Sequence, residues 1–212
     1  MLSKVVRMNR IKRIFDLLCQ YYKEYGVIGL LIHLYEKLKW FLFKRKFKKI
    51  GKNTFVESPF VIRGEKYMTV GNNFNARKRL QLEAFDTHNG VCFHPQIIIG
   101  DRVSINYDVH IGAINKIIIE DDVLIASKVF IADHSHGKIE AACLEIPPQK
   151  RILYSKGPVH IKQRTWIGEG VVIMPNVTIG ENCIIGANSV VTKDVPDNCV
   201  VAGNPATLLK RF

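Results

Sequence analysis

The chain lacks paired cysteines. Its five cysteines are odd in number, widely scattered and never arranged as C-x-x-C: Cys19, Cys92, Cys143, Cys183 and Cys199. This distribution argues against a disulfide framework and predicts reduced thiols. The first residues, interrupted by four basic side chains, do not resemble a secretory signal. We therefore expect a protein of the cytoplasm.

Long apolar runs are also missing, because no stretch of the first 50 residues approaches the roughly 20 residues that span a bilayer. Apolar side chains fall on two helical stripes instead, from Ile11 to Tyr25 and from Leu31 to Leu42, separated by a break at 26–29. Acidic residues are scarce here: these 50 residues hold 13 of the 31 Lys and Arg but 3 of the 19 Asp and Glu. Nearly all of the net charge of +12 therefore lies in this segment.

Basic and aromatic side chains alternate at the end of the segment, where Trp40, Phe41 and Phe43 lie among seven Lys and Arg of residues 37–49. This pattern is typical of an interfacial helix on anionic lipid, so residues 9–49 are predicted to lie against the inner face of the cytoplasmic membrane. The alternative is that the stripes pack on the rest of the protein or on another subunit. Nucleic-acid binding is not expected, because no base-reading motif accompanies the charge.

From residue 50 the sequence follows a period of six. An aliphatic residue stands at every sixth position from Ile161 to Val191, and the ladder extends back to Ile50 less regularly, with a turn-rich excursion at 86–91. Such a period predicts stacked coils of three short parallel strands around an aliphatic core. Glycine often follows the aliphatic, and we expect it to supply positive φ at the corners. The fold class is thus an all-β prism over 50–212 with an α-helical extension over 1–49.

One long break interrupts the ladder, over residues 133–158. Loops of this length in compact folds are usually functional, and this one begins with Asp133, His134, Ser135 and His136. A neutral imidazole can accept a proton from a hydroxyl group during a reaction. His134 is therefore a candidate general base, and the alternative is a surface histidine without a catalytic role.

Several motifs resemble those of the hexapeptide-repeat acyltransferases. They are GPVHI at 157–161, WIG at 166–168, GANSVVTKDVP at 186–196 and AGNPA at 202–206, together with the ladder and the loop. The resemblance covers roughly residues 50–212 and is strongest to the sugar O-acetyltransferases of O-antigen, capsule, galactosides and maltose. It implies a left-handed parallel β-helix, a homotrimer, acetyl-CoA as donor, active sites between subunits and no metal.

The resemblance also implies roles for individual residues. His134 takes the place of the catalytic histidine, which would act by direct transfer without an acyl-enzyme, and His136 is the alternative base or orients the acceptor. Asn106 and Asp108 stand where relatives have acceptor contacts, although they would also suit the repeat as turn-stabilising corner residues. The implied contacts to CoA are Trp166, Gly168, Ala187, Thr192, Lys193, Asn204, Pro205, Lys210 and Arg211.

These features predict an acetyl-CoA-dependent O-acetyltransferase that modifies a sugar hydroxyl of a bacterial surface glycan or its lipid-linked precursor. The first alternative is an N-acetyltransferase of a nucleotide-linked amino sugar, although no glycine-rich fingerprint of the usual Rossmann-like domain precedes residue 50. A second alternative is a zinc lyase of the carbonic anhydrase kind that uses His110, His134 and His136. A third is a non-catalytic trimeric scaffold.

Overall fold

The computed structural model describes residues 2–212, with side chains at residues 12, 16 and from 18 onward. The chain forms two compact units, Met1–Phe43 and Lys44–Phe212. The charge pattern of the sequence predicts this boundary at residue 49, after the run of basic residues. In the structure the short 3-10 helix η1 (Lys44–Lys46) already belongs to the second unit.

The first unit is the helical segment α1 (Leu2–Phe43). Gly26 interrupts it with a φ of 68° and a ψ of −171°, so the segment consists of two helices that meet at this residue. Glycine tolerates positive φ because it has no Cβ, and the break lies within the predicted interval 26–29. Among the helical residues that the structure describes, no stretch is both long enough and apolar enough to cross a bilayer.

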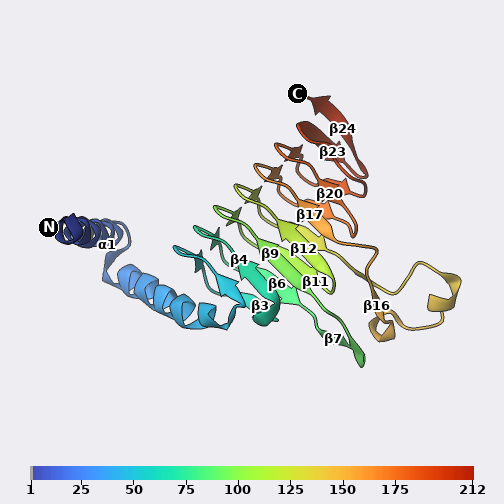
Figure 1. The fold of residues 1–212 in the computed structure, drawn as a ribbon, viewed down its shortest axis with the longest axis horizontal. Helices are drawn as coiled ribbons and strands as arrows, with labels where there is room; N and C mark the ends of the chain where they lie inside the picture. The colour runs from blue at the N-terminus through green and yellow to red at the C-terminus, as the bar shows by residue number, and fades with distance from the viewer. Residues whose placement is uncertain (1) are drawn as a thin grey trace. The chain divides into compact units, whose positions relative to one another are not determined.

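The second unit is a stack of coils built from three sheets (Figure 1). Each regular coil gives one strand to sheet 1, one to sheet 2 and one to sheet 3, in that order. Sheet 1 contains β1 (Lys49–Ile50), β4 (Met68–Val70), β9 (Gln96–Ile99), β12 (Lys116–Ile119), β17 (Val159–Ile161) and β20 (Thr178–Ile179). Sheet 2 contains β2 (Phe55–Val56), β5 (Asn75–Ala76), β10 (Ser104–Ile105), β13 (Leu124–Ile125), β18 (Trp166–Ile167), β21 (Ile184–Ile185), β23 (Cys199–Gly203) and β24 (Ala206–Arg211).

Sheet 3 contains β3 (Val61–Arg63), β6 (Gln81–Ala84), β11 (His110–Ala113), β14 (Phe130–Ala132), β19 (Val172–Ile173) and β22 (Val190–Val191). Strands within each sheet are parallel, except that β24 runs antiparallel to β23 and closes sheet 2. We call the edge where the chain passes from sheet 2 to sheet 3 the 2–3 edge, and the edge where it passes from sheet 3 to sheet 1 the 3–1 edge.

The aliphatic ladder forms the core, as the sequence predicts. Ile119 pairs with Ile99 below it and with Ile161 above it, and Ile161 pairs with Ile179. These side chains point into the prism and are at most 1% exposed. Each buried isoleucine or valine stabilises the fold by about 1.5–3 kcal/mol, so the column is a sufficient core.

The corner glycines do not have the role that we expected from the sequence. Gly100 and Gly180 have φ outside the left-handed region, but a Cβ at Gly100 would lie 2.4 Å from Asp121 Oδ1, and one at Gly180 would lie 2.4 Å from the backbone nitrogen of Asp197. Glycine is needed here because the next coil approaches too closely for a side chain. Asparagine, aspartate and basic residues, such as Asn182 at 55°, adopt the positive φ instead.

Two excursions leave the stack at the 3–1 edge (Figure 1). The first excursion begins after β6 and contains the antiparallel hairpin β7 (Thr87–His88) and β8 (Val91–Cys92). The 3-10 helix η2 (Glu65–Tyr67) lies at the same edge in the coil below. The second follows β14 and contains β15 (Ser135–His136), η3 (Ala141–Cys143), η4 (Pro148–Lys150) and β16 (Leu153–Tyr154), with β15 antiparallel to β16.

Candidate active site

His134 directly follows Asp133 at the 3–1 edge, and the aspartate orients its ring. The Nδ1 of His134 lies 3.0 Å from Oδ1 of Asp133. The Asp133 side chain is fully buried, and its two oxygens accept the backbone N–H groups of Ile114 and Asn115 at 2.9 and 2.8 Å. A ring that donates from Nδ1 to this carboxylate carries its free lone pair on Nε2. The pair therefore presents an oriented base.

Phe85 of the first excursion shields the His134 ring. The two ring centroids are 5.8 Å apart and the rings meet edge to face at 79°. The His134 side chain remains 12% exposed. A base that is held by a buried carboxylate, partly covered by an aromatic ring and still accessible suits proton abstraction from a bound hydroxyl.

The first excursion also braces the second. Asn89 donates from Nδ2 to the backbone oxygen of Gln149 at 2.9 Å, and the rings of His88 and His136 lie 5.8 Å apart at 76°. His136 itself is exposed on β15. The sequence indicated an excursion at 86–91 but gave no sign that it contacts the loop at 133–158, because the contact joins residues about 60 positions apart.

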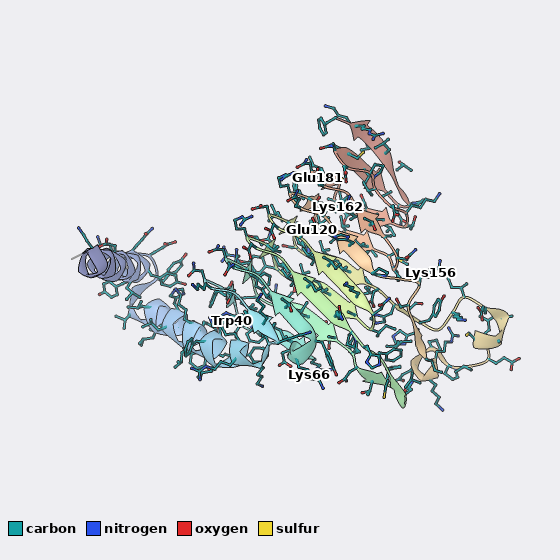
Figure 2. The ribbon with its side chains drawn as sticks, viewed as in Figure 1. Trp40, Lys66, Glu120, Lys156, Lys162 and Glu181 are labelled. Atoms are coloured by element: carbon teal, nitrogen blue, oxygen red, sulfur yellow. The ribbon has the colours of Figure 1, made fainter. Side chains whose placement is uncertain are left out.

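Thr192 and Lys193 lie on the same edge as His134. They follow β22, which is separated from β14 by β19 alone in sheet 3. A groove of about 500 Å³ runs between this edge and the second excursion, and Thr192, Met174, Tyr154 and Lys156 line it. Lys156 lies at the base of the excursion (Figure 2).

The other residues assigned to the donor lie on sheet 2 and on the 2–3 edge. Trp166 lies on the outer face of β18 and is 50% exposed. It pairs across sheet 2 with Ile184 on β21. Val200 on β23 pairs with Ile184 on one side and with Lys210 on β24 on the other. The same region includes Gly168, Ala187, Asn204, Pro205 and Arg211. These residues and His134 lie on opposite sides of sheet 3. The width of this sheet is the length of a strand such as β11, whose four residues span about 13 Å. One chain does not bring the two groups together.

Asn106 and Asp108 lie on the 2–3 edge, before β11. Asp108 forms an ion pair with Arg79, whose Nη2 lies 2.7 Å from Oδ2, and this hydrogen bond lowers the pKa of the Asp108 carboxyl. Asp108 lines a groove of about 350 Å³ on the outer face of sheet 3 together with Arg79, Gln81 and His110. The lining of the groove does not include His134 or Asn106, and His110 is its only residue on β11.

Of the three histidines of the zinc alternative, His110 and His134 both approach Gly112, but they have different partners and His136 lies elsewhere. His134 contacts Asp133, His136 faces His88, and His110 lies beside Glu83. Over the part of the chain that the structure describes, no group of three or more His, Cys, Asp and Glu side chains is placed to hold a metal ion.

Comparisons with known proteins agree with this fold. Residues 158–193 match the family described as bacterial transferase hexapeptide (six repeats). The chain is 37% identical over 194 residues to the putative lipopolysaccharide biosynthesis O-acetyl transferase WbbJ of Escherichia coli K12, covering 90% of this chain and 92% of that protein.

Two solved structures extend the likeness. A galactoside acetyltransferase in complex with coenzyme A is 32% identical with a TM-score of 0.51, over 80% of this chain and 68% of that one. A maltose O-acetyltransferase from Clostridium difficile 630 is 29% identical with a TM-score of 0.58, over 93% and 89%. The prism is thus a left-handed parallel β-helix, and the chain belongs to the hexapeptide-repeat acyltransferases, the family of the sugar O-acetyltransferases.

Proposed function

We propose that this protein transfers the acetyl group of acetyl-CoA to a sugar hydroxyl of a bacterial surface glycan or its lipid-linked precursor. The observation that carries the proposal is the buried Asp133 carboxylate, which holds the imidazole of His134 where the long excursion begins. The printed names of the relatives, a lipopolysaccharide biosynthesis O-acetyl transferase and a galactoside acetyltransferase, support a sugar acceptor and this donor.

In the proposed reaction His134 is the general base. Its Nε2 takes the proton of the acceptor hydroxyl while the oxygen forms a bond to the thioester carbonyl carbon. The C–S bond then breaks, and the departing thiolate takes the proton back from the imidazolium. Asp133 stabilises the positive ring between the two transfers, as a buried carboxylate does beside a catalytic histidine. No acyl-enzyme is needed, because donor and acceptor react directly.

His136 suits an orienting role better than that of the base. It is exposed and lies against the ring of His88, whereas His134 contacts the carboxylate of Asp133. An exposed imidazole without a fixed tautomer is a less well oriented acceptor of the proton.

We propose that the complete site forms between two copies of the chain in a homotrimer. The 3–1 edge of one copy would supply His134, Thr192 and Lys193, and sheet 2 of a second copy would supply Trp166 and its neighbours. The support is the width of sheet 3, which keeps these two groups of residues apart within one chain. CoA would then lie between the copies.

The test is an assay of the full-length chain with acetyl-CoA and a panel of sugars that carry hydroxyl groups or one amino group. We expect thiol release that depends on a hydroxyl acceptor, and a product that gains one acetyl group by mass spectrometry. Mild base should remove that group, because esters hydrolyse and amides survive. A base-stable product formed with amino sugars alone would support the N-acetyltransferase instead, and no transfer to any acceptor would support the scaffold.

We also propose that the second half of α1 contacts an anionic lipid surface. Leu31, Tyr35, Leu38 and Phe41 are exposed in the structure, and lysines follow them closely in sequence. Basic residues near an anionic surface contribute about 1 kcal/mol each, so the full chain should sediment with phosphatidylglycerol vesicles and not with phosphatidylcholine vesicles. Replacing Lys37 and Lys39 with glutamate should weaken sedimentation. Equal binding to both vesicles, or binding to neither, would contradict this proposal.

A further inference from the structure

Glu83 and His110 lie on the outer face of sheet 3, close to the candidate base. Gln81 pairs with His110 and Glu83 pairs with Gly112, while Leu82 and Ile111 between them point into the core. A strand alternates its side chains between the two faces, so Glu83 and His110 point outward. Glu83 is nevertheless only 8% exposed. Its carboxylate therefore lies in a sheltered place on an outer surface.

The contact between these two residues leaves a polar atom without a hydrogen bond. His110 Nε2 lies 3.3 Å from Glu83 Oε2, yet this nitrogen is buried and has no hydrogen-bond partner among the described residues. The other carboxylate oxygen, Oε1, lies 3.5 Å from Nη1 of Arg63. Buried polar atoms in proteins nearly always have a hydrogen-bond partner. The unpaired Nε2 of His110 is therefore a candidate contact for a bound ligand.

A second histidine–glutamate pair in the same chain shows what a complete pair looks like. His160 Nε2 lies 2.7 Å from Glu120 Oε1 in a hydrogen bond, and Glu120 Oε2 also accepts the backbone N–H of Gln163. Glu120, Lys162 and Glu181 follow one edge of the stack, and Lys156 lies on the opposite side (Figure 2). The pair of His160 and Glu120 is satisfied within the protein, whereas the pair of His110 and Glu83 is not.

Gly112 connects the open pair to the candidate base. Its φ lies outside the left-handed region, so its backbone conformation does not require glycine. A Cβ at this position would lie 3.4 Å from Cε1 of His134, 3.6 Å from Cε2 of Phe85 and 3.7 Å from Nε2 of His110. Both histidines therefore approach the buried Gly112, and its missing side chain leaves room for one small group, such as a hydroxyl, between them.

A groove of about 350 Å³ on the outer face of sheet 3 ends at His110, the nearer member of this pair to the 2–3 edge. Its lining also includes Gln81, Arg79 and Asp108. Apolar residues, among them Phe60 and Val61, line the rest. A groove with apolar walls and a few polar groups at its ends suits a sugar ring, which has apolar faces and a polar rim.

We propose that Glu83 and His110 bind the acceptor over Gly112, by hydrogen bonds to a hydroxyl next to the one that His134 deprotonates. The ligand class is a sugar ring with two adjacent free hydroxyl groups. Glu83 accepts the hydrogen of the second hydroxyl, and the unpaired Nε2 of His110 bonds to the same group after a rotation of its ring. This proposal rests on the proposed function, and it names the residues that select the acceptor.

The test compares three variants of the full-length chain. Gly112→Ala adds a methyl group at ordinary contact distances of 3.4–3.7 Å, so the protein should fold unchanged while the space above Gly112 is filled. Glu83→Gln removes the charge at constant volume. Glu120→Gln is the matched control, because it changes the same kind of residue beside a histidine at another edge.

The probes are methyl β-galactopyranoside and methyl α-glucopyranoside, each with its monodeoxy analogues. We expect Gly112→Ala and Glu83→Gln to raise KM for the glycoside at least tenfold and to leave KM for acetyl-CoA within twofold, whereas Glu120→Gln changes neither. In the wild type, a probe that lacks the hydroxyl next to the acetylated one should have its KM raised by the same factor as Glu83→Gln raises KM for the complete glycoside. Unchanged KM for the glycoside in both Gly112→Ala and Glu83→Gln would overturn the proposal.

A binding measurement separates this proposal from the proposed function. If the wild type transfers no acetyl group to these glycosides, saturation-transfer NMR with the same probes still reports binding to the full chain. A saturation-transfer signal that is lost in Gly112→Ala and kept in Glu120→Gln would support the sugar-binding site even if the protein catalyses a different reaction. The same signal in all variants, or no signal in the wild type, would overturn it.

Discussion

Oδ1 of Asp133 lies 3.0 Å from Nδ1 of His134, the next residue in the chain. The same carboxylate accepts two backbone N–H groups from the corner of the coil below, at Ile114 and Asn115. The imidazole is therefore oriented by the stacking of two regular coils and does not depend on the tip of the excursion. On the proposed mechanism, we therefore expect that catalysis and the stability of the fold can be separated at His134 and are coupled at Asp133.

Replacing His134 with alanine should abolish most of the transfer without unfolding the protein. General-base catalysis contributes about 10² to 10⁴ in rate, so we expect kcat to fall by that factor in an assay of thiol release. The side chain lies at the edge of the stack and packs on Phe85 alone among aromatic residues of the described chain, so the melting temperature should change little. His136→Ala is the comparison: loss of a residue that orients the acceptor should raise KM for the sugar and lower kcat much less than His134→Ala. A His134→Ala enzyme with wild-type kcat would exclude this residue as the base.

Changes at Asp133 should affect both stability and rate. Asp133→Ala leaves the buried N–H of Ile114 unpaired, which costs about 1–3 kcal/mol of unfolding free energy, and also the partly buried N–H of Asn115, which costs less. Asp133→Asn keeps one acceptor oxygen and should be less destabilised, but it no longer carries the charge that stabilises the imidazolium, so we expect kcat to fall about 10²-fold or more. Denaturant titration and kinetics on the folded fraction measure the two effects. Equal stability of Asp133→Ala and the wild type would contradict the role of the carboxylate.

Trp166→Ala should weaken the interaction with acetyl-CoA and leave the fold intact. The indole is 50% exposed on the outer face of sheet 2, and substitutions at such sites usually change stability by about 0.5 kcal/mol or less. We expect KM for acetyl-CoA to rise about tenfold, because a large aromatic contact is lost. Leu124→Ala is the matched control, since Leu124 is 42% exposed and pairs with Trp166 in register. Equal effects of the two changes would argue against a specific contact with the donor.

Removing the side chain of Asn89 should loosen the second excursion. Asn89 has a φ of 48°, which glycine adopts without strain, so Asn89→Gly removes the hydrogen bonds to the backbone oxygens of Gln149 and Arg151 without straining the folded backbone. A hydrogen bond contributes about 0.5–1.5 kcal/mol, and we expect faster amide exchange at residues 137–152 together with a lower kcat. Asn73→Gly is the control, because Asn73 has a φ of 56° at a corner without an excursion. Unchanged exchange in Asn89→Gly would show that the excursion is held by other contacts.

The last coil should lose stability in acid through Asp197. The backbone N–H of Glu181 and the ammonium of Lys162 hold the pKa of this carboxyl below its usual range. A group with a lowered pKa in the folded state contributes stability that is present above about pH 4, where a free aspartate is ionised, and lost as the pH falls through the folded-state value. The melting temperature of Asp197→Asn should therefore depend less on pH between about pH 4 and pH 2 than that of the wild type. Parallel curves would contradict this role.

Most of the fold could be predicted because the signal is local. The inward aliphatic residues recur every six positions, so the strands from β17 to β22 follow from the sequence directly. The corners were less predictable: we expected Gly180 to supply positive φ, but the residue is required because the next coil approaches at 2.4 Å. Positive φ occurs instead at Asn182 and similar residues. A distance between coils has no local signature in the chain.

The candidate site was predictable only at its starting point. The break after Ile131 marks His134, since the ladder stops there. The partners of the histidine depend on how the coils stack. Phe85 follows β6, two coils below His134, and Gly112 lies on β11, one coil below. Glu83 on β6 pairs with Gly112 on β11 although the first excursion lies between these strands in the sequence. An excursion changes the residue spacing between successive coils, so these contacts could not be counted from the period of six.

Both excursions leave at the 3–1 edge, while the strands above and below them stay paired in register. A change in the length of either excursion therefore leaves the aliphatic column untouched. The segments 85–95 and 133–158 can therefore change in length or sequence at little cost in folding. On the proposed function, exchanging them would alter what surrounds His134, while Glu83 and His110 remain in place on β6 and β11.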